Sequence, residues 1–519
     1  MKFDVVIAGG GFAGAYCARV LGKALGKHGA KRVALIAERN VLVFQPMLAE
    51  VAGSALSPLD VVNPLREFCR EVNVLQGRIH KIDWTMKHLV VDGGRFTRNR
   101  EIGFDHLVLT LGSVTDMSRV PGMTDHAWPM KDVADALRLR AAIINRLEEA
   151  NLVENEEVRR RLMTFVVVGG GYTGVETAGQ LLDLLREVRH LYVNLHDTPP
   201  KVILVHSHEH LLEEIGPKLG DYAQRVLEKR GMEMRLGARV TEVTAAKVTL
   251  QNGDSIETHT VVCTVGNAPS RVAMDLCKQV GAVAERGRIP TEPTMQVKGV
   301  SKLWTAGDCA AVPWDDKGEL KVSPPTAQFA MRQGKQLGRN LARVLKGEPA
   351  QAFHYRYMGQ LATVGERAAV AEIFGMHFSG FIAWWMWRTI YLAKLPGAGR
   401  KFRVMIDWTF DLFFARDISV VLPPAEDVLR AIHLEKGESL FLIGDKVRAF
   451  YVVKRGAIAL QRAGEDPLTL GPGSVIDQGY STESGTWAAG ASATESTDVV
   501  VIRGRALEML KTTLKLVAR

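Results

Sequence analysis

The sequence contains little cysteine and no apolar segment long enough to span a membrane. Five cysteines are spread over 519 residues and none forms a close pair, which is typical of a protein that folds in a reducing compartment without disulfides. No run of about 18 uncharged apolar residues occurs, so we expect no membrane-spanning helix. The first strand begins at about Phe3, which leaves no room for a secretory leader, and we expect none.

The sequence also lacks any motif typical of nucleic-acid-binding proteins, although 66 basic against 57 acidic residues give it a net charge of +9. A basic balance favours anionic surfaces, so we expect an anionic lipid surface rather than nucleic acid as the partner. The one histidine-rich segment, residues 206–210, directly follows an apolar strand. A surface loop explains that segment better than a ligand cluster, and we expect no metal site.

Two glycine-rich loops of the same form are present. Residues 9–14 (Gly-Gly-Gly-Phe-Ala-Gly) and 169–174 (Gly-Gly-Gly-Tyr-Thr-Gly) each follow a short apolar run. The order strand, tight glycine turn and helix places a pyrophosphate at a helix N-terminus. Two such units predict two dinucleotides, a resident flavin and a visiting nicotinamide. The glycines expected to hold them are Gly9, Gly11 and Gly14 in the first loop and Gly169, Gly171 and Gly174 in the second.

Residues farther along the chain are expected to complete the flavin site. Glu38 ends the strand after the first loop, 24 residues past its last glycine, close to the roughly 20 residues expected of an acid that binds ribose hydroxyls. The strand at 104–111 returns the chain beneath the nucleotide and ends at Gly112. A Gly-Asp turn places Asp308 to bind a ribitol hydroxyl. A helix beginning at Ala327 would direct its positive end at the flavin edge where negative charge develops.

The second unit follows a stretch at 132–162 that we expect to be helical, because apolar residues recur there at three- and four-residue spacing. Its second strand ends at His206, and the strand-rich stretch 239–265 ends at Gly266. We expect both residues beside the nicotinamide nucleotide. The order of the segments is that of one nucleotide domain nested inside another.

The composition changes near residue 376. Three of the nine tryptophans fall within 384–387, and Arg388, Lys394 and three further basic residues follow up to position 403. Aromatic side chains with basic flanks suit the headgroup layer of a bilayer, and Arg388 and Lys394 suit an interfacial helix whose cations reach the surface. The alternative is a helix pair packed on the body of the protein. Residues 425–519 show short alternating strands between glycine turns, which predicts a small β-roll closed by a helix.

Taken together, these motifs resemble the two-dinucleotide flavoproteins and, within them, the type II NADH dehydrogenases, which are single-chain NADH:quinone oxidoreductases. The resemblance covers residues 1 to about 423. Beyond the glycines it rests on short segments at 44–48 (Phe-Gln-Pro-Met-Leu), 50–53 (Glu-Val-Ala-Gly), 174–176 (Gly-Val-Glu), 325–328 (Pro-Thr-Ala-Gln) and 380–384 (Gly-Phe-Ile-Ala-Trp).

The resemblance implies an enzyme with FAD and NADH as cofactors that reduces a membrane quinone without pumping protons. It would lie peripherally on the cytoplasmic face of the inner membrane, with a homodimer as an option. Two residues would be catalytic: Gln328, which would contact FAD and hydrogen-bond a quinone carbonyl, and Glu176, which would orient the nicotinamide or relay protons. Ile382 would line the quinone tunnel, and Pro46 would belong to the same site.

Several positions depart from the family's pattern. His206 stands where an acid is usual, and Glu209 could substitute for it. NADH is still favoured, although NADPH stays open, because no arginine stands ready for a 2′-phosphate. Ser379 replaces a common basic residue and Arg332 a common glutamine, which leaves the quinone type open.

Two other functions stay open. A sulfide-linked or disulfide reductase of related fold would need a cysteine pair beside the flavin, and Cys309 has no visible partner. A redox sensor would signal through the tail, whose residues 433–456 resemble the opening of a cyclic-nucleotide-binding β-roll. No arginine lies between Arg462 and Arg503 to pair with a cyclic phosphate. Docking, dimerisation or membrane contact is therefore the better expectation for the tail.

The predicted fold class is α/β, with two nested Rossmann-like dinucleotide-binding domains, a C-terminal membrane-surface helical module and a small all-β roll. The expected boundaries are 1–115 and 269–346 for the FAD-binding domain, 116–268 for the NAD(P)H-binding domain, 347–423 for the membrane-anchoring and quinone module and 424–519 for the roll.

Overall fold

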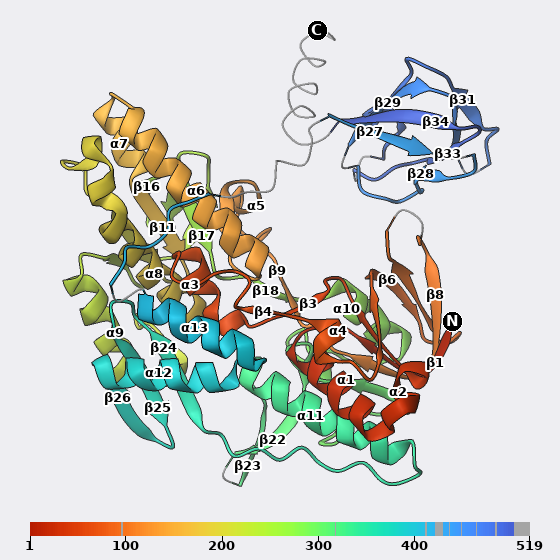
Figure 1. The fold of residues 1–519 in the computed structure, drawn as a ribbon, viewed down its shortest axis with the longest axis horizontal. Helices are drawn as coiled ribbons and strands as arrows, with labels where there is room; N and C mark the ends of the chain where they lie inside the picture. Colours follow the sequence, from red (N-terminus) through yellow and green to blue (C-terminus); the bar gives the residue numbers. More distant parts are fainter. Residues whose placement is uncertain are drawn as a thin grey trace. The chain divides into compact units, whose positions relative to one another are not determined.

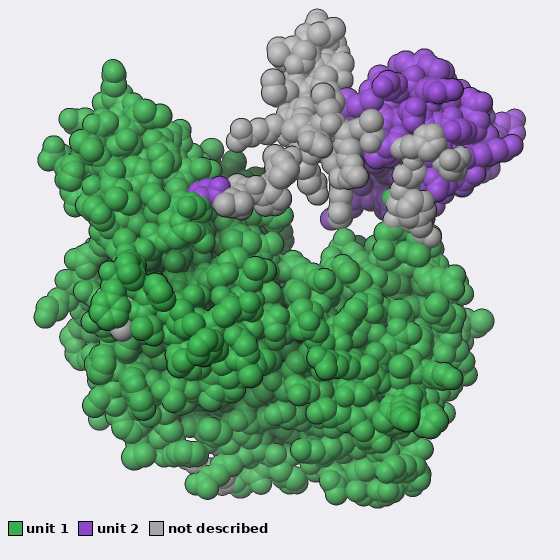
Figure 2. All heavy atoms as spheres, in the orientation of Figure 1, with its two compact units in different colours: residues 1–419 green, residues 420–519 purple. Residues whose placement is uncertain are grey.

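The computed structural model (Figure 1) describes residues 1–94, 97–316, 318–410, 413–420, 429–434, 436–447, 449–462, 464–482 and 485–502. The chain divides into two compact units, residues 1–419 and residues 420–519 (Figure 2). The boundary expected at Pro423-Pro424 and the helix expected at the end of the chain lie outside the described residues.

The first sheet of unit 1 carries the first glycine loop. Its central strands are buried apolar runs that lie parallel to one another, as expected of a sheet covered on both faces. In spatial order the strands are β5 (Asn73–Gln76), β2 (Val33–Ala37), β1 (Lys2–Ala8), β8 (Arg100–Leu109), β7 (His88–Asp92) and β6 (Arg78–Asp83), with β20 (Leu303–Thr305) also paired to β8.

The second sheet carries the second glycine loop and is parallel throughout. Its strands are β10 (Ala127–Pro129), β17 (Thr260–Cys263), β11 (Thr164–Val168), β12 (Lys201–Val205) and β13 (Glu233–Arg235), accompanied by helices α6 (Val133–Leu152), α7 (Glu156–Leu162), α8 (Tyr172–Val188) and α9 (Pro217–Lys229) and by the hairpin strands β14 (Val240–Val243), β15 (Lys247–Leu250) and β16 (Ser255–Glu257).

The expected helix at 132–162 is interrupted. Helix α6 ends at Leu152, and α7 begins at Glu156. The side chain of Asn155 accepts hydrogen bonds from the amides of Glu157 and Val158 at 2.9 and 3.1 Å, which caps the second helix. An N-cap side chain of this kind satisfies amides that a new helix leaves unpaired, so it starts a helix where periodicity alone predicts continuation.

The second sheet is inserted between parts of the first. The chain leaves the first sheet through β9 (Ser113–Thr115) and returns through β18 (Asn267–Pro269), and these strands pair antiparallel. Gly112 and Gly266 immediately precede them, and both have positive φ, +66° and +88°. After the return, the chain forms helix α10 (Arg271–Gln279), adds strand β20 to the first sheet and then forms helix α11 (Ala327–Val344).

Helix α11 packs closely along α1 (Phe12–Leu25), and the two lie side by side in Figure 1. Glycines permit this approach: a Cβ on Gly334 would lie 2.2 Å from the carbonyl oxygen of Ala13, and one on Gly338 would lie 2.7 Å from that of Cys17. The packing brings the N-termini of both helices to the mouth of the first glycine loop.

The last part of unit 1 is a small antiparallel sheet followed by two helices. It consists of β24 (Gly359–Thr363), β25 (Ala369–Ile373), β26 (Met376–Ser379), α12 (Gly380–Lys394) and α13 (Ala398–Phe410). Trp387 is 1% exposed whereas Trp385 is 60% exposed, so the tryptophan-rich helix has a packed face and an open face. None of the described helices is long and apolar enough to cross a bilayer.

Unit 2 is built from antiparallel strands in its described residues. One sheet has β27 (Leu429–Leu434), β34 (Thr497–Ile502), β29 (Phe450–Arg455) and β32 (Val475–Ile476), and the other has β28 (Ser439–Phe441), β33 (Gly490–Ala493), β30 (Ile458–Gln461) and β31 (Leu468–Leu470). Phe441 stacks on Trp487 with ring centroids 4.1 Å apart in the core of this unit.

Candidate active site

The first glycine loop opens into a cavity of about 560 Å³. Gly9 has a φ of +115°, and a Cβ on Gly14 would lie 1.9 Å from the carbonyl oxygen of Gly9, so Gly14 lies beneath the loop and lets the helix approach it. The predicted flavin-site residues that line the cavity are Gly9, Gly11, Glu38, Gly112, Asp308 and Ala327.

The cavity fits a dinucleotide with a pyrophosphate and a ring system. Its lining includes the first residues of α1 and α11, Phe12 and Ala327, so two positive helix ends meet there. Asp308 accepts a hydrogen bond from the hydroxyl of Ser113 at 3.5 Å, and the ammonium of Lys131 donates to that hydroxyl at 2.9 Å. Amides, a carboxylate and a volume of this order are what an extended nucleotide requires.

The second glycine loop repeats the backbone of the first. Gly169 has a φ of +119°, and a Cβ on Gly174 would lie 1.8 Å from the carbonyl oxygen of Gly169. Gly171, like Gly11, has open space where a Cβ would project. The backbone geometry of the two loops is therefore the same at these glycines.

The register of the strands changes which residues correspond between the loops. The amide of Gly9 donates to the carbonyl of Ile36, and the amide of Gly169 donates to the carbonyl of Val205. His206 is therefore the counterpart of Ala37, and Ser207 is the counterpart of Glu38. The sequence expectation that His206 replaces the ribose acid is one residue out of register with the first loop.

His206 turns back onto its own loop. Its Nδ1 accepts a hydrogen bond from the amide of Gly170 at 3.1 Å. Burial and the neighbouring ring of His208 lower the pKa of His206, which favours the neutral ring that this contact needs. His208 and His210 lie 3.0 Å from carboxylates of Glu213 and Asp221, and within the described part of the chain no cluster of three or more ligand side chains is arranged for a metal ion.

Glu176 lies in the first turns of α8 and is 8% exposed. The amide of Thr363 donates to its Oε1 at 3.2 Å. Burial raises the pKa of Glu176 to about 8, so the carboxyl group holds its proton at neutral pH. A carboxyl group in this state can supply or accept a proton during turnover.

Gln328 lies in the first turn of α11, one residue after the cavity-lining Ala327. Its Nε2 donates to the carbonyl of Gly359 at 3.4 Å, and its Oε1 accepts from the ammonium of Lys394 at 3.3 Å. Gly359 begins β24, the strand whose other end, Thr363, holds Glu176. The two backbone groups lie about 13 Å apart at the usual strand rise. One strand thus supports both candidate catalytic residues.

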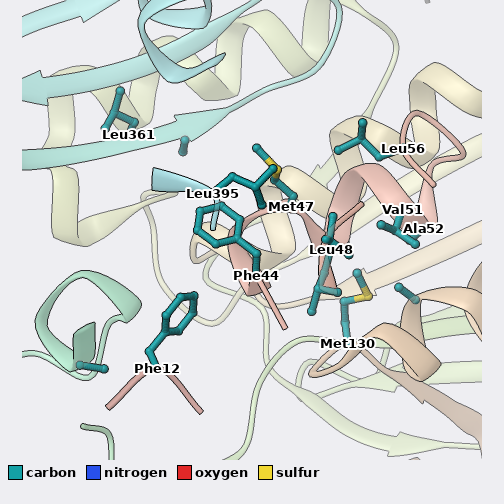
Figure 3. Close-up of a cluster of buried hydrophobic side chains, with 14 of the residues drawn as sticks. Phe12, Phe44, Met47, Leu48, Val51, Ala52, Leu56, Met130, Leu361 and Leu395 are labelled. Carbon is teal, nitrogen blue, oxygen red and sulfur yellow. The ribbon is translucent and has the colours of Figure 1, made fainter. Parts of the chain in front are cut away.

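An apolar cluster joins the predicted quinone segment to the end of α12. Pro46 lies in a short turn of 3₁₀ helix (Gln45–Met47), and Phe44 packs edge-on against Tyr391 with centroids 6.1 Å apart. Leu395, Phe44 and Met47 belong to the same buried apolar cluster (Figure 3). The residues that follow the flavin-side strand therefore contact the helix of the membrane module.

Comparisons with known proteins agree with this geometry. The family model described as pyridine nucleotide-disulphide oxidoreductase matches residues 3–334, and the NDH2 C-terminal domain matches residues 357–417. The type II NADH:quinone oxidoreductase Ndh of Mycobacterium tuberculosis is 32% identical over 427 residues, which cover 80% of this chain and 89% of the relative. The type II NADH:quinone oxidoreductase NdhA of the same organism is 31% identical over 421 residues, which cover 78% of this chain and 86% of the relative.

Solved structures show the same fold. NDH2 from Plasmodium falciparum in complex with NADH superposes with a TM-score of 0.74 at 18% identity and covers 80% of this chain and 99% of that chain. The sulfide:quinone oxidoreductase of Aquifex aeolicus gives a lower TM-score of 0.58 at 15% identity and covers 81% and 96% of the two chains.

The chain belongs to the type II NADH:quinone oxidoreductases. Membership in this family confirms the predicted enzyme class, an FAD-dependent oxidoreductase that oxidises NADH and reduces quinone, and its cofactors FAD and NADH. The α/β dinucleotide-binding fold is confirmed at the level of the family.

The cysteines of this type II NADH:quinone oxidoreductase argue against a thiol-based reaction. All five, including Cys309, are described, buried and free. Burial raises the pKa of the Cys309 thiol and so opposes the thiolate that disulfide exchange requires. Cys277, which lies within electrostatic reach of Cys309, is buried and free as well, and burial likewise raises the pKa of its thiol.

Two cations of α12 contact other side chains of unit 1. The guanidinium of Arg388 lies over the rings of Trp384 and Trp408, 4.0 and 4.8 Å from their centroids. The ammonium of Lys394 turns inward to Gln328 rather than outward as expected of a cation on an interfacial helix. Ile382 is 63% exposed and lies about 18 Å along the helix from Lys394. The sequence did not indicate the contact between Lys394 and Gln328, because the direction of a long side chain depends on what packs around it.

Proposed function

We propose that this protein is a peripheral, non-proton-pumping NADH dehydrogenase that reduces a membrane quinone from the cytoplasmic face of the inner membrane. The observation that carries the proposal is the shared strand β24, which contacts Glu176 after the second glycine loop and Gln328 at the start of α11. The chemistry that bound FAD supplies is hydride acceptance from NADH and two-electron donation to a quinone. NADH, a quinone and one proton then yield NAD⁺ and a hydroquinone.

The residues of the first loop would hold FAD and those of the second would hold NADH. The amides at Gly9, Gly11 and Gly14 would bind the flavin pyrophosphate, and Glu38 and Asp308 would accept hydroxyl hydrogen bonds. Gly112 and Ala327 line the same cavity. In the second unit these tasks would fall to Gly169, Gly171, Gly174 and the segment at His206, with Gly266 at the return of the chain.

Glu176 would act as a proton-bearing group during NADH oxidation, and Gln328 would bind the quinone. A protonated Glu176 can donate a hydrogen bond to the carboxamide of the nicotinamide without placing a negative charge beside the hydride acceptor. The amide of Gln328 can donate a hydrogen bond to a quinone carbonyl, whose oxygen becomes more negative as electrons arrive. Pro46 and Ile382 would border the route by which the quinone enters.

The open face of the membrane module would contact lipid. Exposed aromatic and aliphatic side chains gather on α12 and α13, namely Phe381, Ile382, Trp385, Phe402, Met405 and Phe410. Exposed apolar side chains on paired amphipathic helices with basic neighbours suit the headgroup region of a bilayer. The tail would serve docking or homodimerisation, and its likeness to a cyclic-nucleotide-binding roll rests on its antiparallel sheets and opening sequence pattern.

One experiment tests the redox function. The purified holoprotein is mixed with NADH, and flavin absorbance is followed before and after addition of a short-chain quinone. We expect NADH to bleach the flavin and the quinone to restore its absorbance. Failure of NADH to bleach it would overturn the proposal, and bleaching without recovery in quinone would favour the redox-sensor alternative.

A second experiment tests the lipid contact. The triple variant Phe381→Ser, Trp385→Ser, Phe402→Ser is sedimented with anionic liposomes beside a control, Leu152→Ser with Val283→Ser, which removes exposed apolar side chains elsewhere in unit 1. We expect binding to be lost only in the triple variant. Equal sedimentation of all three proteins would reject the lipid contact.

A further inference from the structure

Lys394 closes α12 and points into the protein rather than toward solvent. It is half-buried, and its Nζ donates to Oε1 of Gln328 at 3.3 Å. It also lies 5.6 Å from the centroid of the Tyr391 ring, one turn earlier on the same helix. A cation held in this position pays a desolvation cost, and burial together with Arg332 lowers the pKa of Lys394 to about 8.

The contact with Lys394 decides which way the amide of Gln328 faces. A lysine ammonium can only donate, so it contacts the amide oxygen, and the NH₂ group must point the other way. One N–H of that group donates to the carbonyl of Gly359 at 3.4 Å. The second N–H is then set to donate to an incoming acceptor. If the amide rotated by half a turn, it would present an oxygen, which repels a carbonyl oxygen.

The backbone of Gln328 is held as well. Nη1 of Arg332, one turn farther along α11, donates to its carbonyl oxygen at 3.0 Å, and the guanidinium of Arg332 lies 4.2 Å from the centroid of the Tyr355 ring. Two cations from different helices therefore flank Gln328. Fixed positive charge and oriented donors at the place where negative charge develops favour a transition state without reorganisation.

We propose that Lys394 is a positioning residue for quinone reduction, which holds the amide of Gln328 with its N–H toward the quinone carbonyl. The proposal rests on the proposed contact between Gln328 and the quinone. Lys394 is part of helix α12 in the membrane module, but its side chain contacts Gln328 in the proposed acceptor site. Lys394 acts through Gln328 and takes no part in the oxidation of NADH.

The test separates the two half-reactions in detergent solution with a short-chain quinone. For Lys394→Met, we expect the rate of flavin bleaching by NADH to be unchanged and the rate of recovery in quinone to fall about tenfold, the loss expected for one hydrogen bond to a charged group. Lys394→Arg should restore most of the rate because it keeps the charged donor. In a Gln328→Met background, Lys394→Met should add no further loss.

Lys401→Met provides the matched control. Its ammonium donates to the backbone carbonyl of Ala393 at 2.7 Å, so it removes the same charge from the same module without touching Gln328. We expect both half-reactions of this variant to match the parent protein. If Lys394→Met recovers at the parental rate while Gln328→Met is slow, the role of Lys394 is wrong. If Gln328→Met also recovers at the parental rate, the proposed quinone contact itself is wrong.

Discussion

The two glycine loops of this protein have the same backbone and different surroundings. Their first glycines have φ values of +115° and +119°. A Cβ on the last glycine of either loop would collide with the carbonyl oxygen of that loop's first glycine, at 1.9 and 1.8 Å. The first loop opens into a cavity bordered by Glu38 and two helix starts. In the second loop, the ring of His206 accepts a hydrogen bond from the amide of Gly170. The glycines determine the backbone of each loop, whereas the residues after the next strand determine which side chains border it.

The largest effect is expected from a side chain beneath the first loop. Gly14→Val should displace the loop by clashing with the carbonyl of Gly9 and lower NADH:quinone turnover about a hundredfold through loss of FAD. FAD content is measured by absorbance after purification, with thermal unfolding to confirm that the protein is folded. Gly399→Ala, at a helical position with open space around it, is the control. Stoichiometric FAD in Gly14→Val would contradict a resident flavin at this loop.

The same change beneath the second loop should spare the flavin. Gly174→Val places its side chain against the carbonyl of Gly169, and we expect full FAD content with about thirtyfold weaker NADH-dependent bleaching, the scale of one overpacked contact. Dithionite should still bleach this variant fully, because that reductant does not need the second loop. Loss of FAD from Gly174→Val would show that the loops do not divide the two cofactors as proposed.

Glu176 should make the NADH side sensitive to alkaline pH. Its pKa is raised to about 8 by burial, so the carboxyl group is protonated below that pH and becomes a carboxylate as pH rises through it. A carboxylate at this position would lose the hydrogen bond to the carboxamide of the nicotinamide and would oppose the negative charge that the hydride brings to the flavin, so NADH-dependent bleaching should slow above pH 8. Glu176→Gln should lose this inflection and slow bleaching about tenfold at pH 7. An unchanged inflection near pH 8 in the variant would assign it to another group.

Most of the fold and half of the site could be predicted from the sequence. The strands, turns and helices around the two loops are local patterns, and Glu38, Gly112, Asp308 and Ala327 follow from their places at strand and helix ends. The break in the helix at Asn155 was missed because one capping side chain outweighs apolar periodicity there.

Other features depend on contacts between distant segments. The inward turn of Lys394 requires Gln328, which lies 66 residues earlier in the chain, and no charge pattern within α12 indicates it. The register of His206 is likewise a property of strand pairing: counting residues from the glycines located the end of β12 but not which residue matches Glu38.

The smallest effect concerns the choice between NADH and NADPH. Because Ser207, not His206, corresponds to Glu38, an acid at position 207 should make the second loop resemble the first. Ser207→Glu should raise the preference for NADH over NADPH about fivefold, since a carboxylate accepts from ribose hydroxyls and repels a 2′-phosphate by about 1 kcal/mol across water. The ratio of the two kcat/KM values with one quinone measures this preference. His206→Asp is the comparison variant: it loses the contact with Gly170 and should weaken both nucleotides rather than change their ratio. A larger change of this ratio in His206→Asp than in Ser207→Glu would show that the residue at position 206 contacts the ribose. The two loops would then differ in register as well as in sequence.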